Sequence, residues 1–157
     1  MKIKIYYIGR DKKNHHSEAE ALYLKRLKSY VSAEIIAIPP PKFSSSLSGQ
    51  EIKDQEALLL LKHLGEEKSV FLMDEKGKTY NSMSFSKLME QQMAASVKNL
   101  IFVIGGAYGL GKAVKEKYKQ TLRLSDLTFS HHLARTVLLE QIYRAYTILN
   151  NEPYHNK

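Results

Sequence analysis

Hydrophobic positions follow two periods along this chain, one typical of β-strands and one typical of α-helices. Near the N-terminus, Ile3, Ile5 and Tyr7 occupy every second position, which predicts a strand over residues 2–8 that ends at Gly9. Further strands are predicted over residues 34–38, 70–73, 100–104 and 122–124. Helices are predicted over residues 17–30, 51–64, 84–97 and 130–150, with a short one in the basic segment that starts at Lys112.

Capping and turn residues predict where several of these elements end. Ser17 and Ser130 are placed to begin helices, because a serine hydroxyl accepts a hydrogen bond from a backbone N–H of the first turn. Gly65 is placed as the C-cap of the helix over residues 51–64. Residues 74–78, DEKGK, predict a turn.

The alternation of strand and helix predicts an α/β fold with an open, mostly parallel sheet and helices on both faces. Residues 100–104 form a continuous apolar run, which is typical of a central parallel strand. Neither an internal repeat nor a change in composition divides the chain, so residues 1–157 are expected to form a single domain. Ligands of such folds bind beyond the carboxyl ends of the strands, which directs attention to residues 73–77, 105–111 and 125–130.

The composition is that of a folded, basic domain with an expected polyanionic partner. The 157 residues are 43% hydrophobic, and 24 Lys and Arg against 16 Asp and Glu give a net charge of +8. The absence of cysteine excludes disulfide scaffolds, cysteine-based zinc sites, iron–sulfur clusters and thiol catalysis. No signal peptide and no apolar run of roughly 20 residues is present, so we expect a soluble, cytoplasmic protein without a membrane partner.

A glycine-rich segment follows the apolar strand over residues 100–104. Four glycines fall within seven residues: Gly105, Gly106, Gly109 and Gly111. Their spacing with Lys112 matches a phosphate-binding P-loop, but Ala113 stands where that motif needs Ser or Thr for Mg²⁺, which disfavours a P-loop nucleotide hydrolase. The order of the glycines also differs from the dinucleotide-binding fingerprint. The segment therefore predicts a loop that brings backbone N–H groups close to a ligand.

The helix predicted over residues 130–150 carries the candidate acid–base chemistry. His131 lies at its N-terminus, where we expect the helix dipole to lower the pKa of the imidazole and make it a candidate base at pH 7. His131 and His132 are poor joint metal ligands, because adjacent helical side chains diverge by about 100°. Glu140 and Arg144 are spaced for an ion pair on one face of the helix.

Three segments resemble a known family over essentially the whole length of the chain. FVIGGAYGL (residues 102–110), LSDLTFSHHLARTVLLEQIYRA (residues 124–145) and the terminal EPYH (residues 152–155) resemble the RlmH family, bacterial 23S rRNA pseudouridine-N3 methyltransferases of the SPOUT class. The resemblance implies a C-terminal trefoil knot, S-adenosylmethionine as cofactor, a homodimer, no metal, and 23S rRNA in the assembled ribosome as substrate. The alternative is a non-catalytic ribosome- or RNA-binding protein of the same fold.

The resemblance also assigns roles to individual residues. It places cofactor contacts at Met73 (with Leu72 as the alternative), Gly105, Leu124, Ser125, Asp126, Leu127, Thr128 and Phe129. It places His131 near the reacting base, Arg135 and Arg144 on a phosphate or a uracil carbonyl, and Tyr154 and His155 at the site from the tail. Ser130 stands where the family usually has proline.

Overall fold

The computed structural model describes residues 1–10 and 13–155, in which five strands form one sheet. The strands are β1 (Lys2–Ile8), β2 (Ser32–Ile38), β3 (Ser69–Thr79), β4 (Asn99–Ile104) and β5 (Gln120–Arg123). The helices are α1 (Ser17–Leu27), α2 (Gly49–Leu64), α3 (Ser82–Ala94), α4 (Lys112–Lys117) and α5 (His131–Leu149). Strand and helix alternate along the described residues, and neighbouring strands in the order β2-β1-β4-β3-β5 pair in parallel. The predicted α/β fold is confirmed, and the trefoil knot stays a prediction.

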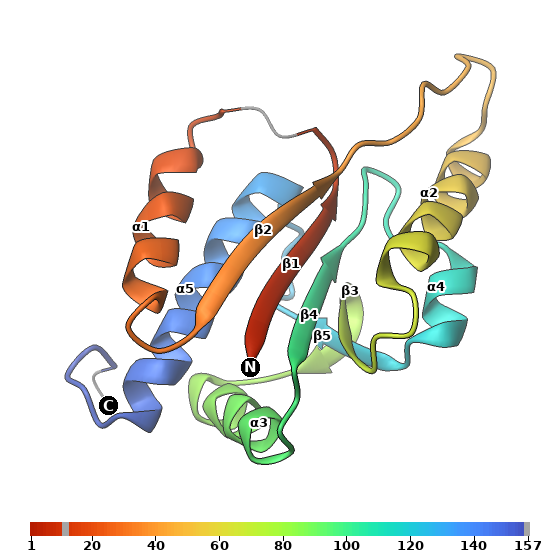
Figure 1. Cartoon of the computed structure of the whole chain (residues 1–157). Coiled ribbons are helices and arrows are strands. Elements are labelled where there is room, and N and C mark those ends of the chain that lie inside the picture. Colours follow the sequence, from red (N-terminus) through yellow and green to blue (C-terminus); the bar gives the residue numbers. More distant parts are fainter. Residues whose placement is uncertain (11–12, 156–157) are drawn as a thin grey trace.

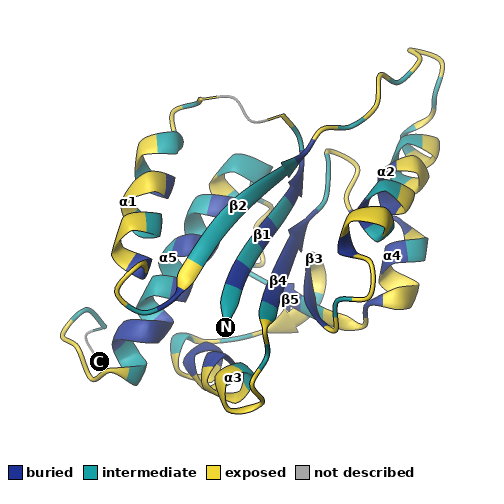
Figure 2. Cartoon of the chain, in the orientation of Figure 1, coloured by how far each residue is buried: buried dark blue, intermediate teal, exposed yellow. Residues whose placement is uncertain are grey.

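Helices cover both faces of the sheet, with α1 and α5 on one side of it and α2 and α4 on the other (Figure 1). The strands divide their side chains between these faces, because successive residues of a strand point in opposite directions. In β4, Phe102 packs with residues of α3 and α5, whereas Ile101 and Val103 pack with residues of α2 and α4. Figure 2 shows the resulting buried positions on the strands and on the helix surfaces that face them. On the face that α1 and α5 cover, the start of α5 lies beside β1.

The ends of the helices follow two of the three predicted caps. The Ser130 hydroxyl accepts a hydrogen bond from the backbone N–H of Leu133 (3.4 Å), and Gly65 ends α2 with a positive φ of 53°. The expected cap at Ser17 was wrong. Ser17 is the first residue of α1, and its hydroxyl accepts from the backbone N–H of Asn14 instead, which closes the turn before the helix.

The turn predicted over residues 74–78 is a bulge inside β3. Both Met73 and Lys78 pair with Leu122 of β5, so the residues between them leave the ladder. A carboxylate oxygen of Asp74 accepts a hydrogen bond from a backbone N–H within the bulge, and Gly77 lies so close to β5 that a Cβ there would be 2.9 Å from the Leu122 backbone. Neighbouring strand pairing therefore overrides the turn signal.

Candidate active site

A cleft of about 590 Å³ opens beside the bulge of β3 and the ends of β4 and β5, within the size range of small-molecule sites. Seven of the eight predicted cofactor residues line it: Met73, Gly105, Leu124, Ser125, Leu127, Thr128 and Phe129. Asp126 is not among the lining residues, and its carboxylate pairs with Arg123 at 2.7 Å. Leu72 is fully buried in the core on the α2 and α4 side, so Met73 is the one that reaches the cleft.

The glycines after β4 form a tight turn that packs on itself. Gly109 donates a backbone hydrogen bond to the carbonyl of Gly106 at 3.0 Å and has a φ of 79°. A Cβ on Gly105 would lie 2.8 Å from the carbonyl carbon of Gly109, so this close approach requires glycine. Lys112, the lysine of the disfavoured P-loop interpretation, does not line the cleft and is 84% exposed beside Glu116.

Two carboxylates near the cleft were missed from the sequence. Glu56 of α2 lies under Gly106, where a Cβ would be 2.5 Å from its Oε2, and burial raises the pKa of this carboxyl. Asp74 follows the apolar part of β3 and pairs with Lys115 at 2.5 Å. Burial acts to raise the pKa of Asp74, but hydrogen bonds from Lys115 and from the Lys76 backbone outweigh it and lower that pKa. Its position directly after an apolar strand was the available signal.

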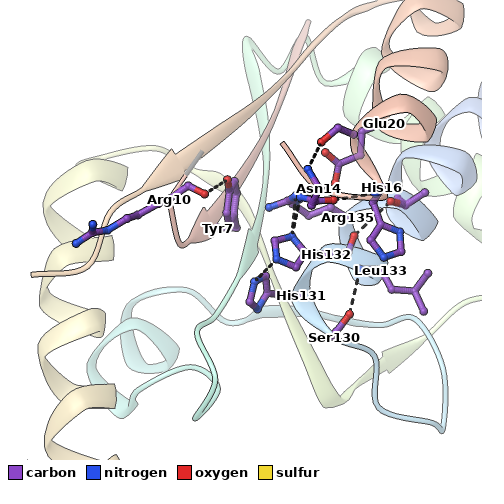
Figure 3. A network of polar contacts seen from close by, with 12 residues as sticks. Tyr7, Arg10, Asn14, His16, Glu20, Ser130, His131, His132, Leu133 and Arg135 are labelled. Atoms are coloured by element: carbon purple, nitrogen blue, oxygen red, sulfur yellow. Dashed lines mark hydrogen bonds and ion pairs between the residues drawn. The ribbon is translucent and has the colours of Figure 1, made fainter. Parts of the chain in front are cut away.

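The first turn of α5 borders the cleft and carries a pair of contacting imidazoles (Figure 3). His131 lines the cleft, and its Nε2 lies 3.1 Å from Nε2 of His132. Burial, followed by the charges of His132 and Arg135, lowers the pKa of His131. The lowered pKa predicted from the sequence is thus confirmed in direction, and desolvation is its largest cause.

Arg135 lies one turn further along α5 and is only 2% exposed. Its Nε donates to Oε1 of Glu20 in α1 at 2.8 Å, and its guanidinium lies 4.0 Å from the centre of the Tyr7 ring. Arg135 does not line the cleft. This placement between α5, α1 and β1 favours a positioning role over the direct phosphate or carbonyl contact expected from the sequence.

The other three predicted catalytic residues meet at the far end of α5. Arg144 pairs with Glu140, as its spacing predicted, and its Nη1 lies 3.4 Å from Nδ1 of His155. The Tyr154 hydroxyl donates to the Glu140 carboxylate at 3.1 Å. Arg144 is 13 residues beyond His131, so the helical rise separates them by about 20 Å along the axis. Within one chain, the predicted catalytic residues therefore form two separate groups.

Comparison with known proteins now decides the family. Residues 1–155 match the family described as "Predicted SPOUT methyltransferase". The chain belongs to the SPOUT methyltransferase family. It is 40% identical over 157 residues to the ribosomal RNA large subunit methyltransferase H of Porphyromonas gingivalis, and 43% identical to that of Parabacteroides distasonis, with the whole of each chain covered.

Solved structures share the fold of this SPOUT methyltransferase. A probable methyltransferase from Bordetella pertussis has a TM-score of 0.57 at 11% identity, with 92% of this chain and 93% of that chain covered. A probable methylase family protein from Haemophilus influenzae has a TM-score of 0.53 at 13% identity, with 95% of this chain and 66% of that chain covered.

SPOUT methyltransferases generally use S-adenosylmethionine. Across residues 1–10 and 13–155 there is no group of three or more His, Asp or Glu side chains that could hold a metal ion. In the same part of the chain no helix is long and apolar enough to cross a membrane.

Proposed function

We propose that this SPOUT methyltransferase transfers a methyl group from S-adenosylmethionine to N3 of a pseudouridine in 23S rRNA, within the assembled ribosome. It acts as a homodimer in the cytoplasm. One observation carries the proposal. Seven of the eight residues that the resemblance assigns to the cofactor line one cleft together with His131, in a chain that aligns end to end with relatives named ribosomal RNA large subunit methyltransferase H.

The residues of the cleft fit S-adenosylmethionine. Apolar side chains of Met73, Leu124 and Phe129 line it and suit the adenine ring and the methylene groups of the methionine arm. The glycine turn at residues 105–109 and the segment 124–129 offer backbone donors and acceptors, which suit the adenine edge and the ribose hydroxyls without adding charge. When bound, the cofactor supplies a methyl group on a sulfonium, and the C–S electron pair returns to sulfur as the methyl leaves.

The chain's own residues mainly position the two reactants, because the methyl group is already activated. N3 of the pseudouridine loses its proton to solvent water, and its freed electron pair forms the new bond to the methyl carbon. His131 borders the cleft at the start of α5, where it is placed to lie beside the reacting nucleobase. Thr128 and Phe129, at the end of the segment 124–129, lead into this helix, so the same loop orients both the cofactor and the substrate.

A second copy of the chain completes the site. Arg144, Tyr154 and His155 lie about 20 Å from His131 along α5, too far for one substrate base to touch both groups in one chain. In a homodimer, the C-terminal group of the partner subunit meets the His131 cleft. A two-fold arrangement gives two such composite sites.

The substrate is a folded site on the ribosome. The net charge of +8 is spread over a small chain, so shape has to supply specificity for one nucleotide. Two small subunits together present a composite surface that fits a folded ribosomal site better than free RNA. We therefore expect poor methylation of protein-free rRNA at near-physiological salt.

Methylation of purified ribosomes tests the proposal. Ribosomes from cells that lack the endogenous enzyme are incubated with tritiated S-adenosylmethionine, and the modified nucleotide is located by mass spectrometry. One methyl at N3 of a pseudouridine is expected, and His131→Ala is expected to lower the rate, whereas His63→Ala, at the exposed end of α2, leaves it unchanged. Cofactor binding without incorporation would refute the substrate, and absence of cofactor binding would favour the non-catalytic RNA-binding alternative.

Mixing two variants that are each expected to have a strongly lowered rate tests the composite site. Co-refolded His131→Ala and Tyr154→Ala chains form mixed dimers in which one of the two sites has both side chains. Random pairing gives half mixed dimers, so about one quarter of wild-type activity is expected to return. Recovery of no activity from the mixture, although mixed dimers form, would place both groups in the same chain's site.

A further inference from the structure

We infer that Asn14, His132 and Arg135 act as positioning residues that hold His131 in its Nδ1–H tautomer, so that His131 donates a hydrogen bond into the cleft rather than accepting the substrate proton. The inference deepens the proposed function and depends on it only for the identity of the substrate group that receives this hydrogen bond. The observation behind it is a continuous chain of contacts that runs from Asn14, in the segment before α1, and from Arg135 of α5 through His132 to His131 (Figure 3).

The chain begins at Asn14, whose amide orientation is set by the backbone. Its Oδ1 accepts a hydrogen bond from the N–H of His16 at 2.8 Å, so the other end of the amide is the NH₂ group. That NH₂ group lies 3.2 Å from Nδ1 of His132. His132 therefore meets a donor at Nδ1.

Arg135 supplies a second donor to the same nitrogen. Its Nη2 lies 3.1 Å from Nδ1 of His132, and a guanidinium has N–H donors but no acceptor. The ion pair with Glu20 and the face of the Tyr7 ring hold this guanidinium in place. With two donors converging on it, Nδ1 of His132 is an unprotonated acceptor, so neutral His132 carries its proton on Nε2.

The proton on His132 then sets the tautomer of His131. The two Nε2 atoms are 3.1 Å apart, and only one of them can carry a hydrogen in this contact. Nε2–H of His132 donates, Nε2 of His131 accepts, and the proton of neutral His131 is on Nδ1. His131 lines the cleft, and its Nδ1 makes no hydrogen bond to residues 1–10 and 13–155.

Burial and the nearby positive charges keep both rings neutral. Burial is the largest cause of the lowered pKa of each histidine, and the positive charge of Arg135 lowers both further. Glu20 acts in the opposite direction on the pKa of His132 but does not reverse the shift, and His16 adds to the lowering. Tyr7, from β1, stacks on the His131 ring at 6.5 Å.

A fixed Nδ1–H changes the role of His131 in methyl transfer. As N3 of the pseudouridine loses its proton to solvent water, negative charge spreads onto the two carbonyl oxygens beside N3. A positioned N–H donor stabilises that charge in the transition state, when the N3 electron pair forms the bond to the methyl carbon and the C–S bond breaks. In this inference His131 acts as a hydrogen-bond donor and not as the base that the sequence suggested.

Nitrogen NMR of the histidine rings tests the tautomers without any substrate. Protein labelled with ¹⁵N-histidine, with ring signals assigned through single variants, is expected to show His131 protonated at Nδ1 and His132 at Nε2 above pH 7. In His132→Ala, His131 is expected to return to the Nε2–H tautomer that free histidine prefers. His131 protonated at Nε2 in the wild type would overturn the inference, whatever the activity on ribosomes.

Isosteric variants test the same point by rate. The amide of Asn can donate near the position of Nδ1 but cannot take a proton. The rate of methyl transfer of His131→Asn is therefore expected to stay within about tenfold of that of the wild type, whereas the rate of His131→Ala is expected to fall roughly 10²-fold or more. His132→Gln, which retains a donor, is expected to keep more activity than His132→Ala. Equal loss in His131→Asn and His131→Ala, with unchanged melting temperatures, would restore the base. Absent methylation with the expected tautomers would refute only the proposed substrate.

Discussion

Removal of the Glu20 carboxylate is expected to destabilise the protein strongly. The Arg135 side chain is 3% exposed and the Glu20 side chain 11%, and their atoms meet at 2.8 Å. Glu20→Ala leaves the guanidinium buried without a counter-ion, and its Nη1 already lacks a partner among the described residues. Breaking a buried pair in this way costs about 3–5 kcal/mol. That is a large share of a total stability of roughly 5–15 kcal/mol.

The expected loss corresponds to a fall in melting temperature of roughly 6–20 °C, because about 2–4 °C accompanies each kcal/mol in a chain of this size. Calorimetry at one fixed protein concentration measures it, since the proposed dimerisation would make the melting temperature depend on concentration. Glu116→Ala is the matched control. It removes an ion pair whose atoms are 3.6 Å apart and whose side chains are 84% and 61% exposed, so a change below about 2 °C is expected. Equal melting temperatures for the two variants would refute the reasoning.

A double replacement separates stability from positioning. Apolar side chains of similar volume often replace a buried ion pair at little or no cost. Glu20→Leu combined with Arg135→Met is therefore expected to recover most of the melting temperature. It removes one donor to Nδ1 of His132, so the rate of methyl transfer is expected to stay low. Recovery of both the melting temperature and the rate of methyl transfer would show that Arg135 contributes only to stability.

Two further predictions concern the cleft and the histidine pair. Gly105→Ala places a Cβ 2.8 Å from the Gly109 carbonyl carbon, so the turn has to shift. Calorimetric titration is expected to show S-adenosylmethionine binding weakened at least about tenfold. The control Gly65→Asn is expected to leave binding unchanged, because asparagine tolerates the positive φ at that position. Because the folded pKa values of His131 and His132 lie below the unfolded value of about 6.5, the unfolded chain binds protons first. The contribution of these two histidines to the free energy of unfolding is complete above about pH 6.5 and decreases as the pH falls below that value. Urea unfolding at pH 7.5 and at pH 6.0 is expected to show a smaller decrease for the double variant His131→Asn/His132→Gln than for the wild type.

The sequence was sufficient for the fold and for the location of the cleft. Alternation in residues 2–8 and the apolar run in residues 100–104 reflect burial, and burial is what places strands in a covered parallel sheet. Parallel strands have their carboxyl ends at one edge, so the loops after three strands could be expected to meet. The bulge in β3 escaped prediction because pairing with β5, 40 or more residues further along the chain, overrides the local turn signal.

The positioning residues of the site could not be predicted, because they depend on contacts between distant segments. Glu20 and Arg135 are 115 residues apart, and Asn14 and His132 are 118 apart. Neither pair leaves a periodic signal, and Arg135 on its own could equally be a surface residue of a helix. Only the packing of α1 against α5 makes that arginine a buried cation.

Arg135 gives the histidine pair its direction. A neutral imidazole has one donor and one acceptor nitrogen, so two neutral rings in contact can pass a hydrogen bond either way. The direction is decided by the group at the end of the chain, and a guanidinium, which has only donors, permits one direction. A carboxylate at the same place would select the opposite one and raise the pKa of the nearer ring. Burial of the positive charge beside Glu20 is therefore the condition for a neutral, donating His131 at the cleft.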